Sequence, residues 1–183
     1  SFFISCISDI KEDSIRENIN IEIELLKMIQ YYSLSKNQND SNAQYNLGIF
    51  YNEGKYLNRN VNKSIYYFSL AANQNHLDAK RMLQNCYVEI YIENLKREAG
   101  LNYSNAQFEL GNIYLNGKYG ELDINKAIYY FTLAANNNHS DAQNKLGFIY
   151  ADKTFIKYDI NKAIYYFTLS SNQNNVFAQC NLG

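Results

Sequence analysis

A repeated stretch constrains this chain more than any other feature. The eleven residues DINKAIYYFTL occur at positions 123–133 and again at 159–169, which is 36 residues later. A second pattern, an Ala-Gln pair followed by Leu-Gly, occurs as AQYNLG, AQFELG, AQNKLG and AQCNLG, beginning at Ala43, Ala106, Ala142 and Ala178. Repeats of this length predict a stacked architecture, in which each unit buries its apolar face against its neighbours.

Both patterns have the apolar spacing of amphipathic helices. With an advance of about 100° per residue, residues 105–115 form a helix whose inward side carries Ala106, Leu110, Ile113 and Tyr114. Residues 124–135 form another, with the inward residues Ala127, Ile128, Tyr130, Phe131, Ala134 and Ala135. Each unit therefore has two helices, which we call helix A and helix B in chain order.

Residues with special backbone roles mark the ends of these helices. Asn60, Asp123 and Asp159 each precede the Lys of helix B by three positions, where a short side-chain oxygen can cap free backbone N–H groups. Gly54 and Gly117 fall in the loop between helix A and helix B and suit a positive φ.

The fold class that follows is all-α. We expect an α-solenoid of stacked antiparallel helix-turn-helix repeats of about 36 residues. Residues 1–40 would form an N-terminal helical segment that includes a lone helix B at 28–38, with residues 1–27 unassigned. The array would span 41–183, with units at 41–76, 77–103 (shortened), 104–139, 140–175 and 176–183 (truncated).

The combined pattern resembles a known repeat. A-x-x-x-L-G-x-x-Y, a Gly-containing loop and D-x-x-K-A-x-x-Y-F-x-x-A-A together are similar to the Sel-one-like repeat (SLR) family, a relative of the tetratricopeptide repeat. The loop favours the former: sixteen residues separate Gly111 from Ala127 and Gly147 from Ala163, where the tetratricopeptide pattern allows twelve. The resemblance implies that the array is a right-handed α-solenoid, an alpha/alpha superhelix, and that the A helices line its concave surface.

One unit departs from the repeat. Its copy of the first pattern is AKRMLQ, which begins at Ala79, and Ala106 follows only 27 residues later. The unit has therefore lost nine residues, including the long loop between helix A and helix B. We expect two short helices joined by a tight turn, and a bend in the groove at this point.

Composition excludes several classes of function. The 17 basic and 18 acidic residues leave a formal charge of −1 without a long basic run, so we expect no nucleic-acid partner. No apolar run approaches the roughly 20 residues that span a bilayer, and we expect a soluble, cytoplasmic protein without direct membrane contact. The chain begins with Ser1 and stops at Gly183 inside a unit, so we expect a longer parent protein; the open end can mediate self-association.

No catalytic or metal-binding motif is present. His76 and His139 occupy the same position of two units and lack a neighbouring ligand or nucleophile in the sequence. Cys6, Cys86 and Cys180 lack the paired spacing of zinc sites or disulfide frameworks, which favours a reducing compartment. We therefore expect no catalytic residues, no metal, no cofactor and no enzymatic activity.

The outward positions of the A helices are the candidate binding residues, because they differ between units while the inward residues repeat. They are Tyr45 and Ile49, Arg81 and Asn85, Phe108 and Asn112, and Asn144 and Phe148. Aromatic and apolar members of this set would anchor a partner. The alternative is that some of them contact the neighbouring helix A as ordinary core.

These observations favour an adaptor or scaffold that binds another protein or peptide along a groove lined by the A helices. A second hypothesis follows from known uses of the repeats that this chain resembles. In that case the array would be the regulatory region of a larger enzyme, such as a kinase, or the lumenal adaptor of a membrane protein-degradation complex.

Overall fold

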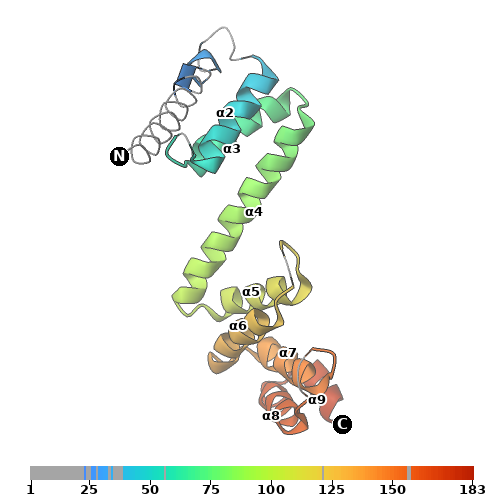
Figure 1. The fold of residues 1–183 in the computed structure, drawn as a ribbon. Helices are drawn as coiled ribbons and strands as arrows, with labels where there is room; N and C mark the ends of the chain where they lie inside the picture. Colours follow the sequence, from blue (N-terminus) through green and yellow to red (C-terminus); the bar gives the residue numbers. More distant parts are fainter. Residues whose placement is uncertain are drawn as a thin grey trace, which may run out of the picture. The chain divides into compact units, whose positions relative to one another are not determined.

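The computed structural model describes residues 23, 26, 27, 29–32, 34, 39–55, 57–120, 122–155 and 158–183 (Figure 1). Every labelled element in these ranges is a helix, which confirms the all-α class. The helices are α2 (Ser41–Glu53), α3 (Val61–Asn73), α4 (Leu77–Gly100), α5 (Ser104–Asn116), α6 (Ile124–Asn136), α7 (Ser140–Ala151), α8 (Ile160–Ser171) and α9 (Val176–Leu182). Residues 1–22, and most of the lone helix B predicted at 28–38, lie outside the described residues.

The chain divides into two compact units, Ser1–Tyr87 and Val88–Gly183, and α4 contributes to both. Within the first unit α2 packs on α3, and within the second α5 packs on α6 and α7 on α8. Each of these pairs is a helix A with its helix B. Further contacts of α6 with α7 and of α8 with α9 join successive pairs.

A glycine sets the closeness of each pair. The Gly of the Leu-Gly dipeptide faces the Phe of helix B, in the pairs Gly48 with Phe68, Gly111 with Phe131 and Gly147 with Phe167. A Cβ atom added to Gly111 would lie 2.5 Å from Cδ1 of Phe131, a separation that no real side chain tolerates. The recurring Leu-Gly therefore lets the backbone of helix A rest against a buried aromatic ring.

The predicted caps are confirmed. The side-chain oxygens of Asn60, Asp123 and Asp159 accept hydrogen bonds from the backbone N–H three residues on, at 2.9 to 3.1 Å. Gly54 and Gly117 end α2 and α5 with φ values of 68° and 60°, a conformation that glycine adopts without strain. Local sequence signals thus define both ends of the loop between helix A and helix B.

The core follows the predicted inward positions. Around α6 and α7, Ala127, Phe131, Ala134 and Ala135 are buried together with Ala142, Leu146 and Ile149. Around α5, Ala106, Leu110 and Ile113 are buried against Leu95 and Ala99 of α4. Small residues therefore alternate with large ones along the contact between helices, which allows close packing.

The prediction of a tight turn in the shortened unit is wrong. Leu77–Gly100 is one continuous helix, α4. The nine missing residues would have contained the loop and its glycine, and the sequence from Leu83 to Tyr91 has no residue that stops a helix. The start of α4 packs like a helix A, since Ala79 and Cys86 join the cluster around Phe68, and its end packs like a helix B against α5.

Candidate partner-binding groove

A cavity of about 480 Å³ opens across three successive A helices, α5, α7 and α9, within the unit Val88–Gly183. Phe108 comes from α5, while Phe177, Cys180 and Asn181 come from α9. Asp141, Asn144 and Lys145 of α7 lie between them in the chain and complete the lining. We call this cavity the A-helix groove.

Amide side chains give the groove its hydrogen-bonding character. The Oδ1 of Asn144 accepts from the Nδ2 of Asn181 at 3.2 Å, and the Oδ1 of Asp141 accepts from the Nδ2 of Asn175 at 2.8 Å. An amide carries two N–H donors and an acceptor oxygen, so one hydrogen bond uses only part of its capacity. Asn144 and Asn181 can therefore also pair with both the N–H and the C=O of a bound main chain.

Buried glutamines hold the A helices in register. The Nε2 of Gln107 donates to the carbonyl of Ala99 at 3.0 Å, and that of Gln143 donates to the carbonyl of Ala135 at 3.2 Å. Each glutamine Oε1 also accepts from an amide just after its own helix B, that of Asn137 or Gln173. One buried side chain thus links a helix A to two B helices. The constant Gln of the four AQ patterns was the signal for this role.

A stack of side chains fixes the C-terminal end of three A helices, α2, α5 and α7. The rings of Tyr114 and Tyr130 are parallel at 5.6 Å, and the Nζ of Lys126 lies 5.2 Å from the centre of the Tyr114 ring. Equivalent stacks occur at Tyr51 with Tyr67 and at Tyr150 with Tyr166. Burial is the main cause that raises the pKa of Tyr130 above its usual value, and the neighbouring Tyr114 is the second cause.

The structure brings two of the predicted binding residues together in the groove, Phe108 and Asn144. Phe108 is half-buried, because one side of its ring is covered by His139, at 4.5 Å between ring centres, and by Phe131, at 5.8 Å. It therefore serves the contact between units as well as the groove. Asn112 and Phe148 do not line the groove, and Phe148, which is 49% exposed, lies 6.0 Å from Phe155.

The other four predicted residues belong to the unit Ser1–Tyr87. Tyr45 and Ile49 are half-buried against the cluster around Phe68, and the Tyr45 ring stacks on His76 at 4.6 Å. Arg81 and Asn85 are exposed on α4, and Arg81 pairs with Asp78 at 3.0 Å. A role for these four residues in binding a partner stays a prediction.

Five further residues line the groove but were not predicted from the sequence: Asp141, Lys145, Phe177, Cys180 and Asn181. Cys180 occupies the position of Phe108 and Asn144 in the next unit, at the same spacing of 36 residues, so the row could have been extended by one step. Phe177 stands where the other AQ patterns have Asn or Asp, and this departure from the repeat was the second available signal.

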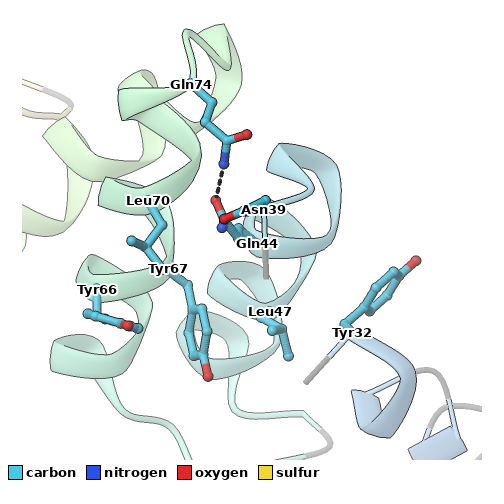
Figure 2. A pocket seen from close by; sticks show the side chains of 8 residues that line it. All are labelled: Tyr32, Asn39, Gln44, Leu47, Tyr66, Tyr67, Leu70 and Gln74. Carbon is cyan, nitrogen blue, oxygen red and sulfur yellow. Dashed lines mark hydrogen bonds between the residues drawn. The ribbon is translucent and has the colours of Figure 1, made fainter. Parts of the chain in front are cut away.

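A second cavity, of about 400 Å³, lies in the unit Ser1–Tyr87 between α2, α3 and Tyr32 (Figure 2). Figure 2 shows Gln74 of α3 reaching Gln44 of α2, in a hydrogen bond of 2.7 Å that matches the one between Gln173 and Gln143. Tyr66, Tyr67 and Leu70 line the α3 side. None of the eight predicted binding residues lines this cavity.

Both histidines act at helix starts. The Nδ1 atoms of His76 and His139 accept hydrogen bonds from the backbone N–H of Ala79 and Ala142. Among the described residues, no group of three or more His, Cys, Asp or Glu side chains could hold a metal ion. In the same part of the chain, no helix combines the length and apolarity that crossing a membrane requires.

These features define a class: the chain is a helical repeat protein whose unit is one pair of helices. The Sel1 repeat family matches residues 41–76, 104–139 and 140–175, which together make up more than half of the chain. The chain therefore belongs to the Sel1 repeat family, as its resemblance to SLR proteins indicated.

The chain is also similar to a sel1-like repeat-containing protein of Acanthamoeba polyphaga mimivirus, with 38% identity over 117 residues. This match covers 59% of the chain but only 21% of that relative, so the chain spans about a fifth of its length. Among solved structures, a Sel1 repeat protein from Oxalobacter formigenes has 21% identity and a TM-score of 0.49, with 91% of this chain and 73% of that one covered. An SLR-fold protective antigen of uropathogenic Escherichia coli has 21% identity and a TM-score of 0.47, with coverage of 82% and 34%.

Proposed function

We propose that this chain is an adaptor that binds an extended segment of another protein in the A-helix groove. The observation that carries the proposal is the cavity of about 480 Å³ shared by α5, α7 and α9. Its residues vary between units, whereas the buried residues that hold the helices together repeat. A surface that varies on a constant scaffold is typical of recognition rather than packing.

The lining favours an extended segment over a helical one. A helix satisfies its own backbone N–H and C=O groups, whereas an extended segment presents them to its surroundings. Asn144 and Asn181 can pair with such a main chain, because each amide offers both donors and an acceptor. The groove therefore offers hydrogen-bonding groups that match the unpaired backbone of an extended segment.

The ends of the groove favour apolar side chains in the bound segment. Phe108 contributes one aromatic ring, and Phe177, which is 74% exposed, contributes another. Aromatic residues commonly contribute much of the binding energy of an interface. Lys145 adds a positive charge and Asp141 a negative one, so the lining carries no net charge, and we expect a segment whose apolar side chains meet the two rings.

Selection from a random peptide display library on the immobilised chain tests this function. The affinity of an enriched peptide is then measured for the wild type and for a double variant, Asn144→Ala with Phe177→Ala. Neither residue is fully buried, so the variant should keep its helical circular dichroism. We expect its affinity to fall at least about tenfold, which corresponds to about 1.4 kcal/mol.

Tyr129→Ala is the matched control, because Tyr129 is an exposed aromatic residue on α6 that does not line the groove. Its affinity should equal that of the wild type. Phe148→Ala, measured beside it, shows whether the binding surface extends to that predicted residue. A peptide that binds the double variant and the wild type equally would place the site elsewhere, and a selection without enrichment would count against peptide binding.

A further inference from the structure

His139 connects two neighbouring A helices at the edge of the groove. Its Nδ1 accepts a hydrogen bond of 3.3 Å from the backbone N–H of Ala142 and so caps the start of α7. Its ring stacks on Phe108 of α5, with 4.5 Å between ring centres and 22° between planes. Because Phe108 also lines the groove, the imidazole joins the start of α7 to a groove wall.

The cap requires a neutral imidazole. A backbone N–H can only donate, so the Nδ1 of His139 must keep its lone pair to accept from Ala142. A proton on Nδ1 removes that hydrogen bond. It also places a positive charge at the N-terminus of α7, where the helix dipole is already positive.

The surrounding charges do not reverse this preference. Burial is the largest influence on His139 and lowers its pKa, since a half-buried imidazole loses water that would stabilise its charge. Asp141 on α7, a hydrogen bond of the ring with the backbone of His139 itself, and Glu109 on α5 act in the opposite direction without outweighing burial, and both carboxylates are exposed to water that screens them. The end of α6 adds only the uncharged amides of Asn136, Asn137 and Asn138.

The other junctions between units provide a comparison within the same chain. His76 has the same arrangement, with a hydrogen bond of 3.2 Å from the Ala79 N–H and a stack on Tyr45 at 4.6 Å. At the start of α9, Asn175 caps instead, accepting from the Ala178 N–H at 3.2 Å. An amide keeps this role at any physiological pH, so asparagine is a cap that does not titrate.

We propose that protonation of His139 releases the start of α7 from α5 and thereby weakens binding in the A-helix groove. The second half of this inference rests on the proposed function, whereas the first half does not. His139 takes up a proton less readily in the folded chain than in the unfolded chain, where its pKa is about 6.5. Stability from this contact is therefore complete above about pH 6.5 and is lost as the pH falls through the lowered pKa.

Hydrogen exchange at the Ala142 amide tests the junction without any ligand. Its protection factor, which is corrected for the intrinsic pH dependence of exchange, is measured by NMR at pH 7.5 and pH 5 in the wild type and in His139→Asn. We expect protection to fall about fivefold in the wild type and to stay constant in the variant, because asparagine caps without titrating. An equal fall in both proteins would overturn the inference.

Titration of the wild type covers the case in which the variant does not fold. The imidazole shifts of His139 and the amide shift of Ala142 should follow one common pH curve with a midpoint below about 6.5. An Ala142 amide that does not respond while His139 titrates would contradict the inference.

The peptide selected on the groove then separates the two halves. It should bind the wild type several-fold more weakly at pH 5.5 than at pH 7.5, with a smaller change for His139→Asn. If the junction titrates but the affinity stays constant, the coupling to the groove is wrong. If no peptide binds at any pH while the Ala142 amide responds, the proposed function fails and the pH-sensitive junction stands.

Discussion

The complete units and the shortened unit bury their apolar residues in different ways. In a complete unit, such as 104–139, Gly111 of helix A lies against Phe131 of helix B. In the shortened unit the equivalent residues are Gln84 and Leu95, and both lie on the single helix α4. The shortened unit therefore has no pairing of helix A with helix B.

This difference indicates which contacts the array retains when a unit is shortened. α4 keeps the contacts of both helix types with the neighbouring units, through Ala79 and Cys86 at its start and Leu95 and Ala99 towards its end. What it lacks is the contact inside the unit, together with the loop and the glycine that make that contact possible. Within the described residues, packing against the neighbouring repeat, rather than pairing of helix A with helix B, is thus common to the complete units and the shortened one.

Truncation of the buried ring should have the largest effect. Phe131 is fully buried in the core around α6 and α7. Phe131→Ala should therefore lower the free energy of unfolding of the compact unit Val88–Gly183 by about 4 kcal/mol. Leu95→Ala, at the equivalent position of α4, should cost about 2 to 3 kcal/mol, because Leu95 is smaller and has no paired helix. Urea unfolding followed by circular dichroism measures both, and an equal loss would mean that pairing within a unit adds nothing.

A methyl group on the contact glycine should be the next most harmful change. Gly111→Ala would force the Phe131 ring out of a closed core, at a cost of about 3 kcal/mol. Gly100→Ala in α4 is the matched control, since no atom lies within 4 Å of the added Cβ, and it should be neutral or stabilising by up to about 1 kcal/mol. Comparable losses in thermal unfolding would argue against the close approach.

Removal of a buried glutamine should have a smaller but clear effect. Gln143→Leu leaves the amide of Gln173 without its acceptor and removes the hydrogen bond to the Ala135 carbonyl, so we expect a loss of about 2 kcal/mol. Lys80 occupies the same position of the shortened unit and is exposed, and Lys80→Leu should change stability by less than about 0.5 kcal/mol. A Gln143→Leu variant as stable as the wild type would contradict the inference that Gln143 holds α7 in register with the neighbouring B helices.

A new cap on α5 should have the smallest effect, and a favourable one. Tyr103 stands where His139 and Asn175 cap their helices, but it makes no side-chain cap hydrogen bond. Tyr103→Asn should therefore stabilise the chain by up to about 1 kcal/mol. The midpoint of urea unfolding measures the gain, and a decrease would show that the exposed Tyr103 ring contributes more than a cap.

Much of the fold could be predicted from the sequence, because packing dictates the inward residues. Ala106, Leu110 and Phe131 are buried where an advance of 100° per residue places them. The course of α4 could not be inferred from the complete units. In those units a turn separates helix A from helix B, but the shortened sequence contains no residue that favours a turn at this point. The replacement of the contact glycine by Gln84 was the neglected sign that no helix B would pair there.

The candidate groove was predictable only in part. The helical angle places Phe108 and Asn144 away from the pairing of helix A with helix B, but it does not distinguish a groove from a neighbouring unit. Phe108 faces both, because His139 reaches it from the start of the next helix A, 31 residues further along the chain. A contact of that kind depends on how the units stack, which a helical projection does not contain.

Alkylation of Cys180 tests most directly whether a partner occupies the A-helix groove. Cys180 is exposed and lines the groove, while Cys86 is buried, and the change Cys6→Ser removes the third thiol. Without a ligand, Cys180 should react readily with iodoacetamide. A saturating concentration of the selected peptide should slow this reaction at least about tenfold in the wild type but not in the Asn144→Ala, Phe177→Ala variant, whose affinity is reduced. An unchanged rate in the wild type with peptide bound would show that the groove is empty in the complex and would contradict the account.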